Sequence, residues 1–281
     1  MNGLIITLLL ICATTGISMG NTYAAPLLND STIRQMFDTT FHIPQLSRSR
    51  TVRVWLPKDY SHSKKRFPVL YMHDGQNLFD AATSYAGEWG LDEAMDTASN
   101  QWIIVAIDNG TVLRMNEYNP NDHERFGKGE GKAYLDFIVN TLKPAVDKKY
   151  RTRKSRNHTA IAGSSMGALI SYYAGIWYPG TFGKVGVFSP SFWIAPQIEE
   201  HTREAVKRNT HSRQDYFFYG GKQEGKEMVP DMERVHAMLQ QLVHPQKKNS
   251  FPIIVNENGK HNEAAWRSQL PAFIDWLNKG S

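Results

Sequence analysis

The chain has 281 residues, a formal net charge of +5, and 41% hydrophobic against 21% charged residues. A chain of this length and composition can bury a sizeable core, which excludes a disordered protein and predicts a single large globular domain. The 32 basic and 27 acidic residues are interspersed rather than segregated, and a single cysteine excludes a framework of internal disulfides.

The first residues resemble a secretory signal peptide. An apolar run from Leu4 to Ala13 is too short to span a bilayer comfortably, and the small residues that follow suit cleavage after Ala24. Cys12 does not follow a small residue, which argues against lipid attachment. We therefore expect a signal peptide over residues 1–24 and a catalytic domain over residues 25–281. We also expect export to a bacterial periplasm or the medium, without a stable membrane anchor.

Beyond this segment, short apolar runs alternate with segments of helical spacing. The predicted strands are residues 50–56, 68–73, 102–107, 159–163, 184–189, 216–220 and 251–255. The predicted helices are residues 90–99, 134–150, 168–178, 232–243 and 263–279. Most of the strands are apolar on both faces, as strands buried in a parallel sheet require. The alternation predicts a doubly wound, mostly parallel α/β sheet with helices on both faces and a ligand site at the carboxyl ends of the strands.

The longest basic cluster, Lys148–Arg156, precedes the predicted strand at 159–163. Such a cluster is compatible with nucleic-acid or anion binding, but it lacks the interleaved aromatic residues of a nucleic-acid-binding surface. We interpret it as the solvated end of a helix and the loop that follows, and we expect no nucleic-acid partner.

A candidate nucleophile lies in GSSMG, Gly163–Gly167, which fits the pattern GxSxG between a predicted strand and a predicted helix. A nucleophile on such a sharp turn needs glycine two residues before and after it, because larger side chains would clash. Only Ser165 has glycine at both positions. The alternative is an ordinary glycine and serine turn with a serine helix cap. We favour Ser165 as a nucleophile that the N-terminus of the following helix helps to stabilise.

A serine nucleophile needs a base, and the base is oriented by an acid. In an α/β-hydrolase the acid and then the histidine follow the serine along the chain. His261 lies in a loop between the last predicted strand and the last predicted helix, where it can reach across the edge of the sheet. The other histidines beyond Ser165, including His236, lie in or beside polar helical stretches and are expected to be solvated.

The acid is expected in the loop that follows the strand at 216–220. Glu224 comes four residues after the end of that strand, at a position from which its side chain can meet His261. Glu227 and Asp231 are the alternatives, and a solvated loop glutamate is the non-functional interpretation of Glu224.

Two backbone N–H groups usually hold the oxyanion of a tetrahedral intermediate. One should come from Met166, after the nucleophile, and the other from Gln76, in the loop HDGQN after an early strand. His73 and Asp74 could instead be metal ligands, but the chain has neither HExxH nor a second cluster of His and Asp residues. We expect no metal and no cofactor.

Together these residues resemble the putative esterase family of α/β-hydrolases, also called the esterase D group. This family includes enterobactin-type siderophore esterases, feruloyl and acetyl-xylan esterases, S-formylglutathione hydrolases and mycolyltransferases. The matching landmarks are YMHDGQNLFD (71–80), GEWGLDEAM (87–95), IDNGTVLRMNEYNP (107–120), LKPAVDKKYRT (142–152), GSSMGALIS (163–171), SPSFW (189–193) and HNEAAW (261–266). They span nearly the whole mature chain.

The resemblance implies a Ser165, His261 and Glu224 triad and an oxyanion hole formed by the N–H groups of Gln76 and Met166. It also implies that Arg114 lies in a loop near the active site. There it would hold an anionic or polyhydroxylated substrate or form a structural salt bridge with Glu117. Trp193, in SPSFW, is a further candidate for substrate binding.

The sequence therefore predicts an exported serine esterase that works through an acyl-enzyme. The expected substrates are a siderophore trilactone or a feruloyl or acetyl ester of a carbohydrate. The alternatives are an acyltransferase of the same fold and a non-catalytic binding protein on a hydrolase scaffold. The sequence leaves the natural ester and the oligomeric state open.

Overall fold

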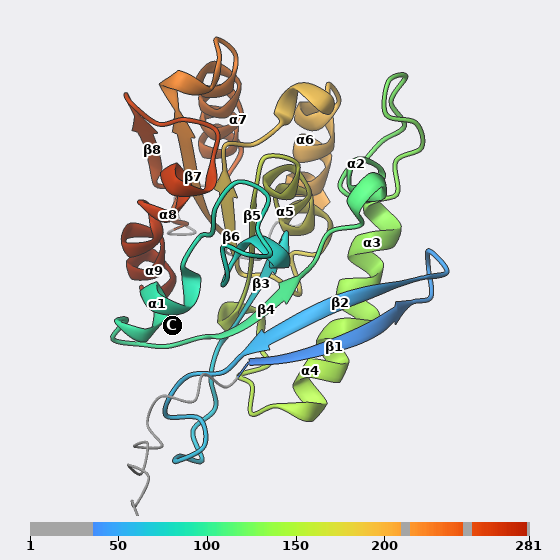
Figure 1. The fold of residues 1–281 in the computed structure, drawn as a ribbon. Coiled ribbons are helices and arrows are strands. Elements are labelled where there is room, and N and C mark those ends of the chain that lie inside the picture. The colour runs from blue at the N-terminus through green and yellow to red at the C-terminus, as the bar shows by residue number, and fades with distance from the viewer. Residues whose placement is uncertain (1–35, 209–213, 244–248, 280–281) are drawn as a thin grey trace, which may run out of the picture. The chain divides into compact units, whose positions relative to one another are not determined.

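An eight-stranded sheet organises the fold (Figure 1). Its strands lie in the spatial order β1 (Met36–Ile43), β2 (Arg48–Trp55), β4 (Ile103–Ile107), β3 (Val69–His73), β5 (Thr159–Ser164), β6 (Lys184–Phe188), β7 (Asp215–Gly221) and β8 (Ile253–Asn256). The computed structural model describes residues 36–208, 214–243 and 249–279, and these belong to one compact unit. The predicted signal peptide and Cys12 lie outside the described residues.

All neighbouring strands from β4 to β8 run parallel, whereas β1 and β2 form an antiparallel hairpin that joins the sheet through β4. The predicted mostly parallel sheet is therefore confirmed. The sequence did not reveal β1, because most of its side chains are exposed and carry no clear apolar alternation. This strand is an edge strand held by its backbone pairing with β2.

The helices connect these strands. They are α1 (Leu91–Asp96), α2 (Arg114–Glu117), α3 (Gly131–Phe137), α4 (Lys143–Lys149), α5 (Met166–Trp177), α6 (Ile198–Arg208), α7 (Met228–Leu242), α8 (Glu263–Arg267) and α9 (Leu270–Asn278). The predicted helix at 134–150 is divided, because a π-helical turn at Ile138–Leu142 separates α3 from α4. Pro144, at the start of α4, cannot donate to the carbonyl four residues earlier, which interrupts the regular ladder there.

The two faces of the sheet bury separate clusters of apolar side chains. Along β3, Val69 and Tyr71 join one cluster, and Leu70 and Met72 join the other. The first cluster also receives side chains from α3 to α7, and the second from α1, α8 and α9. Figure 1 shows α1, α8 and α9 gathered on one side of the sheet and α3 and α4 on the other. Both faces are therefore covered, as strands that are apolar throughout require.

The basic cluster Lys148–Arg156 forms the end of α4 and the loop before β5. Lys148, Lys149 and Lys154 are exposed, and the guanidinium of Arg151 lies 3.7 Å from the centre of the Tyr60 ring. Among the described residues, no helix is both long and apolar enough to cross a membrane.

Candidate active site

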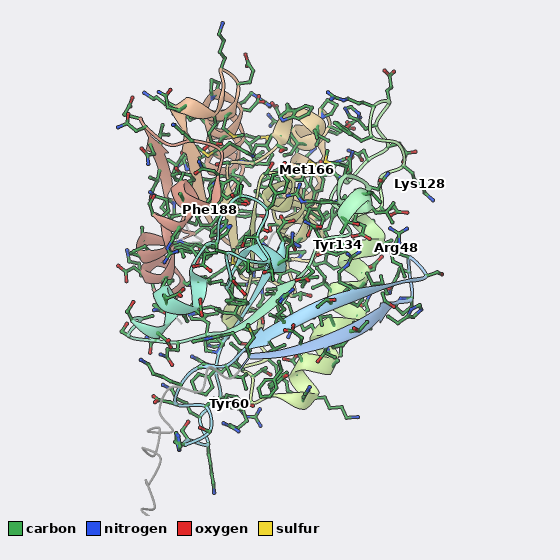
Figure 2. All side chains as sticks on the ribbon, viewed as in Figure 1. Arg48, Tyr60, Lys128, Tyr134, Met166 and Phe188 are labelled. Atoms are coloured by element: carbon green, nitrogen blue, oxygen red, sulfur yellow. The ribbon has the colours of Figure 1, made fainter. Side chains whose placement is uncertain are left out.

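Ser165 lies at a sharp turn between β5 and α5. Its backbone has φ 58° and ψ −121°, a strained conformation for a residue with a side chain. A Cβ atom at Gly163 would lie 2.8 Å from the carbonyl carbon of Gly167, so the first glycine of GxSxG is required by space. The N–H of Ser165 donates to the carbonyl of Phe188 at 2.9 Å. Figure 2 labels Phe188 and Met166, the residue that follows Ser165.

The hydroxyl of Ser165 does not cap helix α5. Although Ser165 occupies the N-cap position, no side-chain capping hydrogen bond forms there. Its Oγ lies 3.2 Å from the Oγ of Ser191 instead. The alternative role of this serine as a helix cap is therefore absent, and its hydroxyl lies at the carboxyl end of β5.

His261 and Glu224 form a hydrogen-bonded pair. Nδ1 of His261 lies 2.8 Å from Oε2 of Glu224, whose side chain is fully buried while that of His261 is 37% exposed. The other carboxylate oxygen, Oε1, accepts the N–H of Gly221 at 2.7 Å and the hydroxyl of Ser189 at 2.8 Å. The ring of Trp266 packs edge-on against His261 at 5.2 Å. These contacts fix the orientation of both members of the pair.

The other candidate acids and bases are engaged elsewhere. Asp231 lies on α7 and pairs with Arg234 at 3.0 Å, and Glu227 is an exposed residue before that helix. The prediction that His236 is solvated was wrong, because this residue is buried on α7 with its Nε2 2.7 Å from the carbonyl of Phe251.

Gln76 lies in a short 3₁₀ turn, Gly75–Asn77, directly after β3. Asp74, before the turn, has φ 56°, and a Cβ atom at Gly75 would lie 2.8 Å from the backbone of Ala106. The side-chain oxygen of Gln76 accepts the N–H of Asn109 at 3.2 Å. The tight turn therefore depends on glycine and on a left-handed residue before it.

The loop after β3 contacts the turn that carries Ser165. A Cβ atom at Gly167 would lie 3.1 Å from Oδ2 of Asp74 and 3.2 Å from Cβ of His73. The second glycine of GxSxG therefore permits the close approach of these two loops. Met166, the first residue of α5, is buried at the same place.

Arg114 forms a two-pronged ion pair with Asp74. Nε lies 2.7 Å from Oδ1 and Nη2 lies 2.8 Å from Oδ2, while Asn109 donates to Oδ1 at 2.7 Å. The suggested salt bridge between Arg114 and Glu117 is not the one found, because Arg50 and Arg48 hold Glu117 instead. Arg114 thus braces the loop before Gln76.

Electrostatics keep both members of this pair charged. Burial alone would raise the pKa of Asp74, but the adjacent Arg114 outweighs it and lowers that pKa. Burial alone would lower the pKa of Arg114, and the Asp74 carboxylate raises it above the ordinary value. His73 and Asp74, considered above as metal ligands, therefore have protein partners, since Nδ1 of His73 lies 3.0 Å from the hydroxyl of Tyr134.

Exposed apolar side chains follow several strands at this edge of the sheet. Trp193 is 55% exposed and packs edge-on against Phe126, with ring centres 6.2 Å apart. Tyr85 follows β3 and is 92% exposed, and Val112 follows β4 and is 89% exposed. Because the carboxyl ends of parallel strands share one edge, these side chains lie on the same edge as Ser165.

Sequence reasoning did not identify several residues that support these groups. Ser189 donates a hydrogen bond to Glu224, and the Ser191 hydroxyl lies beside that of Ser165. The indole N–H of Trp266 donates to Ser189. Oε1 of Glu263 accepts a hydrogen bond from Nδ2 of Asn77, next to Gln76, at 3.2 Å. Burial raises the pKa of Glu263. The available signal was the polar residues of SPSFW directly after a buried strand.

Comparison with known proteins gives consistent matches. A family model described as "Putative esterase" matches residues 43–277. The uncharacterized protein YbbA of Bacillus subtilis is 24% identical over 245 residues, covering 82% of this chain and 92% of YbbA. The iron(III) salmochelin esterase of Escherichia coli is 26% identical and covers 82% of this chain, which spans 56% of that enzyme. The crystal structure of an IroE-like serine hydrolase from Shewanella oneidensis superposes with a TM-score of 0.73 at 19% identity, covering 87% of this chain and 80% of that one.

Proposed function

The chain belongs to the putative esterase family and is a carboxylic-ester hydrolase of the α/β-hydrolase fold; we propose that Ser165, His261 and Glu224 are its catalytic triad. The observation that carries this proposal is the pairing of His261 Nδ1 with the buried carboxylate of Glu224 at 2.8 Å. Their elements follow Ser165 along the chain in the order expected for this fold.

In the proposed reaction, the hydroxyl of Ser165 attacks the ester carbonyl while Nε2 of His261 takes its proton. Glu224 binds Nδ1 and stabilises the imidazolium that forms. The N–H groups of Met166 and Gln76 hold the oxyanion, and the tight turns at both residues fix these donors before the substrate binds. His261 then protonates the leaving alcohol. Water, activated by the same histidine, releases the acid from Ser165 in the second half of the reaction.

We further propose that the acyl or alcohol part of the ester is aromatic or otherwise apolar, as in a catecholate siderophore or a feruloyl ester. Support comes from the exposed side chains of Tyr85, Val112 and Trp193 at the same edge of the sheet as Ser165. The salmochelin esterase among the relatives is consistent with this class. Hydrolysis of a catecholate trilactone and of methyl ferulate should exceed that of acetylated xylan, and the reverse ranking would contradict this assignment.

A fluorophosphonate tests the triad directly, because it reacts with serines that a neighbouring base activates. The mature protein should be labelled at Ser165, as mapped by mass spectrometry of its peptides. Ser165→Ala should abolish labelling and lower kcat toward a p-nitrophenyl ester by several orders of magnitude, since the triad acts as a unit.

Ser164→Ala is the matched control, because it removes the neighbouring hydroxyl and leaves that of Ser165. It should be labelled as the unchanged protein is. A folded wild-type protein that hydrolyses no ester and leaves Ser165 unlabelled would overturn the serine-esterase proposal and favour a binding protein.

A further inference from the structure

Ser189 and Ser191 lie in a segment that the proposed reaction does not use. Ser189-Pro190-Ser191 directly follows β6, and both serines are buried. Ser189 has φ 49°, and Pro190 restricts the backbone after it. This segment is therefore stiff and locally strained.

The strain follows a pattern in the sheet. The described residues other than glycine with positive φ are Ser47, Asp74, Thr111, Ser165 and Ser189. Three of them, Asp74, Ser165 and Ser189, come immediately after the adjacent strands β3, β5 and β6. A positive φ at such residues is strained, and it persists where the surroundings impose it, often at functional sites. Ser189 thus shares the backbone feature of the proposed nucleophile.

Ser189 connects Glu224 with Trp266. Its Oγ lies 2.8 Å from Oε1 of Glu224 and 2.9 Å from Nε1 of Trp266. An indole N–H can only donate, so the hydroxyl of Ser189 accepts from Trp266 and directs its own proton to Glu224. The opposite carboxylate oxygen, Oε2, remains turned toward His261. The directions of the two hydrogen bonds made by the Ser189 hydroxyl are thereby fixed.

Ser191 connects the same segment with the nucleophile. Its N–H donates to the carbonyl of Ser165 at 3.2 Å, and the Oγ atoms of the two residues lie 3.2 Å apart. The N–H of Ser165 in turn donates to the carbonyl of Phe188, just before the segment. One short, stiff segment therefore contacts both the acid and the nucleophile.

We propose that the segment Ser189-Pro190-Ser191 is a brace that fixes the positions of the acid Glu224 and the nucleophile Ser165 relative to each other. This inference rests on the proposed triad. Ser189 is a positioning residue that acts through Glu224: its hydrogen bond to Oε1 keeps Oε2 oriented toward His261. Ser191 contacts the reacting oxygen and donates to Ser165 Oγ, which leaves the proton of Ser165 for the histidine.

Two substitutions at Ser189 separate its hydroxyl from its backbone. Ser189→Ala and Ser189→Gly both remove the hydroxyl, but only glycine tolerates φ 49° without strain. Both should lower kcat for a p-nitrophenyl ester about ten- to a hundredfold with little change in KM, because a hydrogen bond to a charged group is lost. The glycine variant should unfold at higher urea concentration than the alanine variant and be no faster.

The pH profile gives a second readout. A carboxylate that loses a donor binds a proton more readily, so the Glu224 and His261 pair should hold its proton to higher pH. The acid limb of kcat/KM should therefore move to higher pH in both Ser189 variants. Trp266→Phe, which keeps a ring against His261 but lacks the N–H, should move it in the same direction by a smaller amount.

The Ser191 contact is tested by Ser191→Ala, which should lower kcat, and by Ser191→Thr, which keeps the hydroxyl and should restore most of it. Thr202→Val is the matched control, because Thr202 lies on α6 and has a fully buried hydroxyl that contacts Tyr172 rather than a member of the proposed triad. It should leave kcat within about twofold even where stability falls.

Any one of three results would overturn the proposed brace. These are a wild-type kcat in Ser189→Gly, an acid limb of kcat/KM that does not move in the Ser189 variants, and a wild-type kcat in Ser191→Ala. The proposed function is judged separately, since it fails only if the unchanged protein neither hydrolyses esters nor labels at Ser165. A labelled, active wild type with fully active Ser189 and Ser191 variants would refute this inference alone.

Discussion

The residues of GSSMG show how far a local pattern can be interpreted. The two glycines were expected from the steric demands of the turn, and the close approaches at Gly163 and Gly167 bear out that reason. The pattern could not show that the hydroxyl of Ser165 would lie beside Ser191, 26 residues further along the chain. The geometry of the turn could thus be predicted from the local sequence, whereas the contact between Ser165 and Ser191 could not.

Glu224 and Arg114 illustrate two outcomes of assigning a role from position in a loop. Glu224 was expected near His261 because it follows the end of a strand by a few residues, and the two side chains do meet. Arg114 was expected to bind substrate or to pair with Glu117; its ion-pair partner is Asp74, whereas Arg50 and Arg48 hold Glu117. A long, flexible arginine reaches many partners, so its position along the chain constrains its contact weakly.

His73 should make the stability of the protein depend on pH. It is buried against the rings of Tyr118 and Tyr134, and burial lowers its pKa from 6.5 to about 3. Between these values the unfolded chain binds a proton that the folded chain excludes. Stability should therefore fall as the pH falls from 6.5 toward 3, by at most about 1.4 kcal/mol per pH unit.

Urea unfolding at a series of pH values measures this effect. His73→Gln should flatten the decline, because glutamine keeps a polar group near Tyr134 and does not titrate. His42→Gln should leave the decline unchanged, since His42 is exposed on the edge strand β1. An equally steep decline in the His73 variant would assign the effect to other groups.

At the scale of elements, the candidate site is assembled from loops that follow parallel strands. The loops after β3, β5, β6, β7 and β8 supply Gln76, Ser165, Ser189, Glu224 and His261. Each of these residues follows a mostly apolar strand by one to five residues, and this position made all of them except Ser189 candidates from the sequence. Their mutual contacts depend on the order of strands in the sheet, and that order differs from the order in the chain.

The ion pair between Arg114 and Asp74 joins two of these loops and should contribute to stability. Arg114→Met leaves the buried Asp74 carboxylate without its charged partner, and should cost on the order of 3 kcal/mol. Arg208→Met removes an exposed pair with Glu204 and should cost no more than about 1 kcal/mol. Urea unfolding of the two variants gives the comparison.

The same two variants distinguish a structural role of Arg114 from a role in substrate binding. If Arg114 served only to bind substrate, Arg114→Met would raise KM and leave stability close to that of Arg208→Met. Arg114→Met combined with Asp74→Asn should recover part of the lost stability, because the uncompensated charge is then also removed.

At the scale of the whole molecule, apolar clusters cover both faces of the sheet. The polar residues of the candidate site lie at the carboxyl ends of the strands, outside these clusters. The β1 and β2 hairpin extends the sheet beyond β4 and contributes no residue of the proposed triad. Its arginines reach the site indirectly, since Arg50 and Arg48 bind Glu117 on the short helix α2 that begins with Arg114.

Export is the prediction that belongs to the whole chain. Residues 1–24 are predicted to be a signal peptide, so the full chain expressed in a Gram-negative bacterium should appear in the periplasm or medium with Ala25 as its first residue. Intact mass and N-terminal sequencing of the fractionated protein measure this. A cytoplasmic protein that retains residues 1–24 would contradict the prediction.

The sequence by itself determined the alternation of strands and helices, the parallel sheet, and Ser165, His261 and Glu224 as candidates. These features depend on hydrophobic periodicity and on the steric needs of a turn, which are local properties of the chain. Only the tertiary structure decided which side chains meet: Arg114 with Asp74, Ser189 with Glu224 and Trp266, and Ser191 with Ser165. Such contacts join residues distant in the chain, and strand order and side-chain burial select them from many partners of similar chemistry.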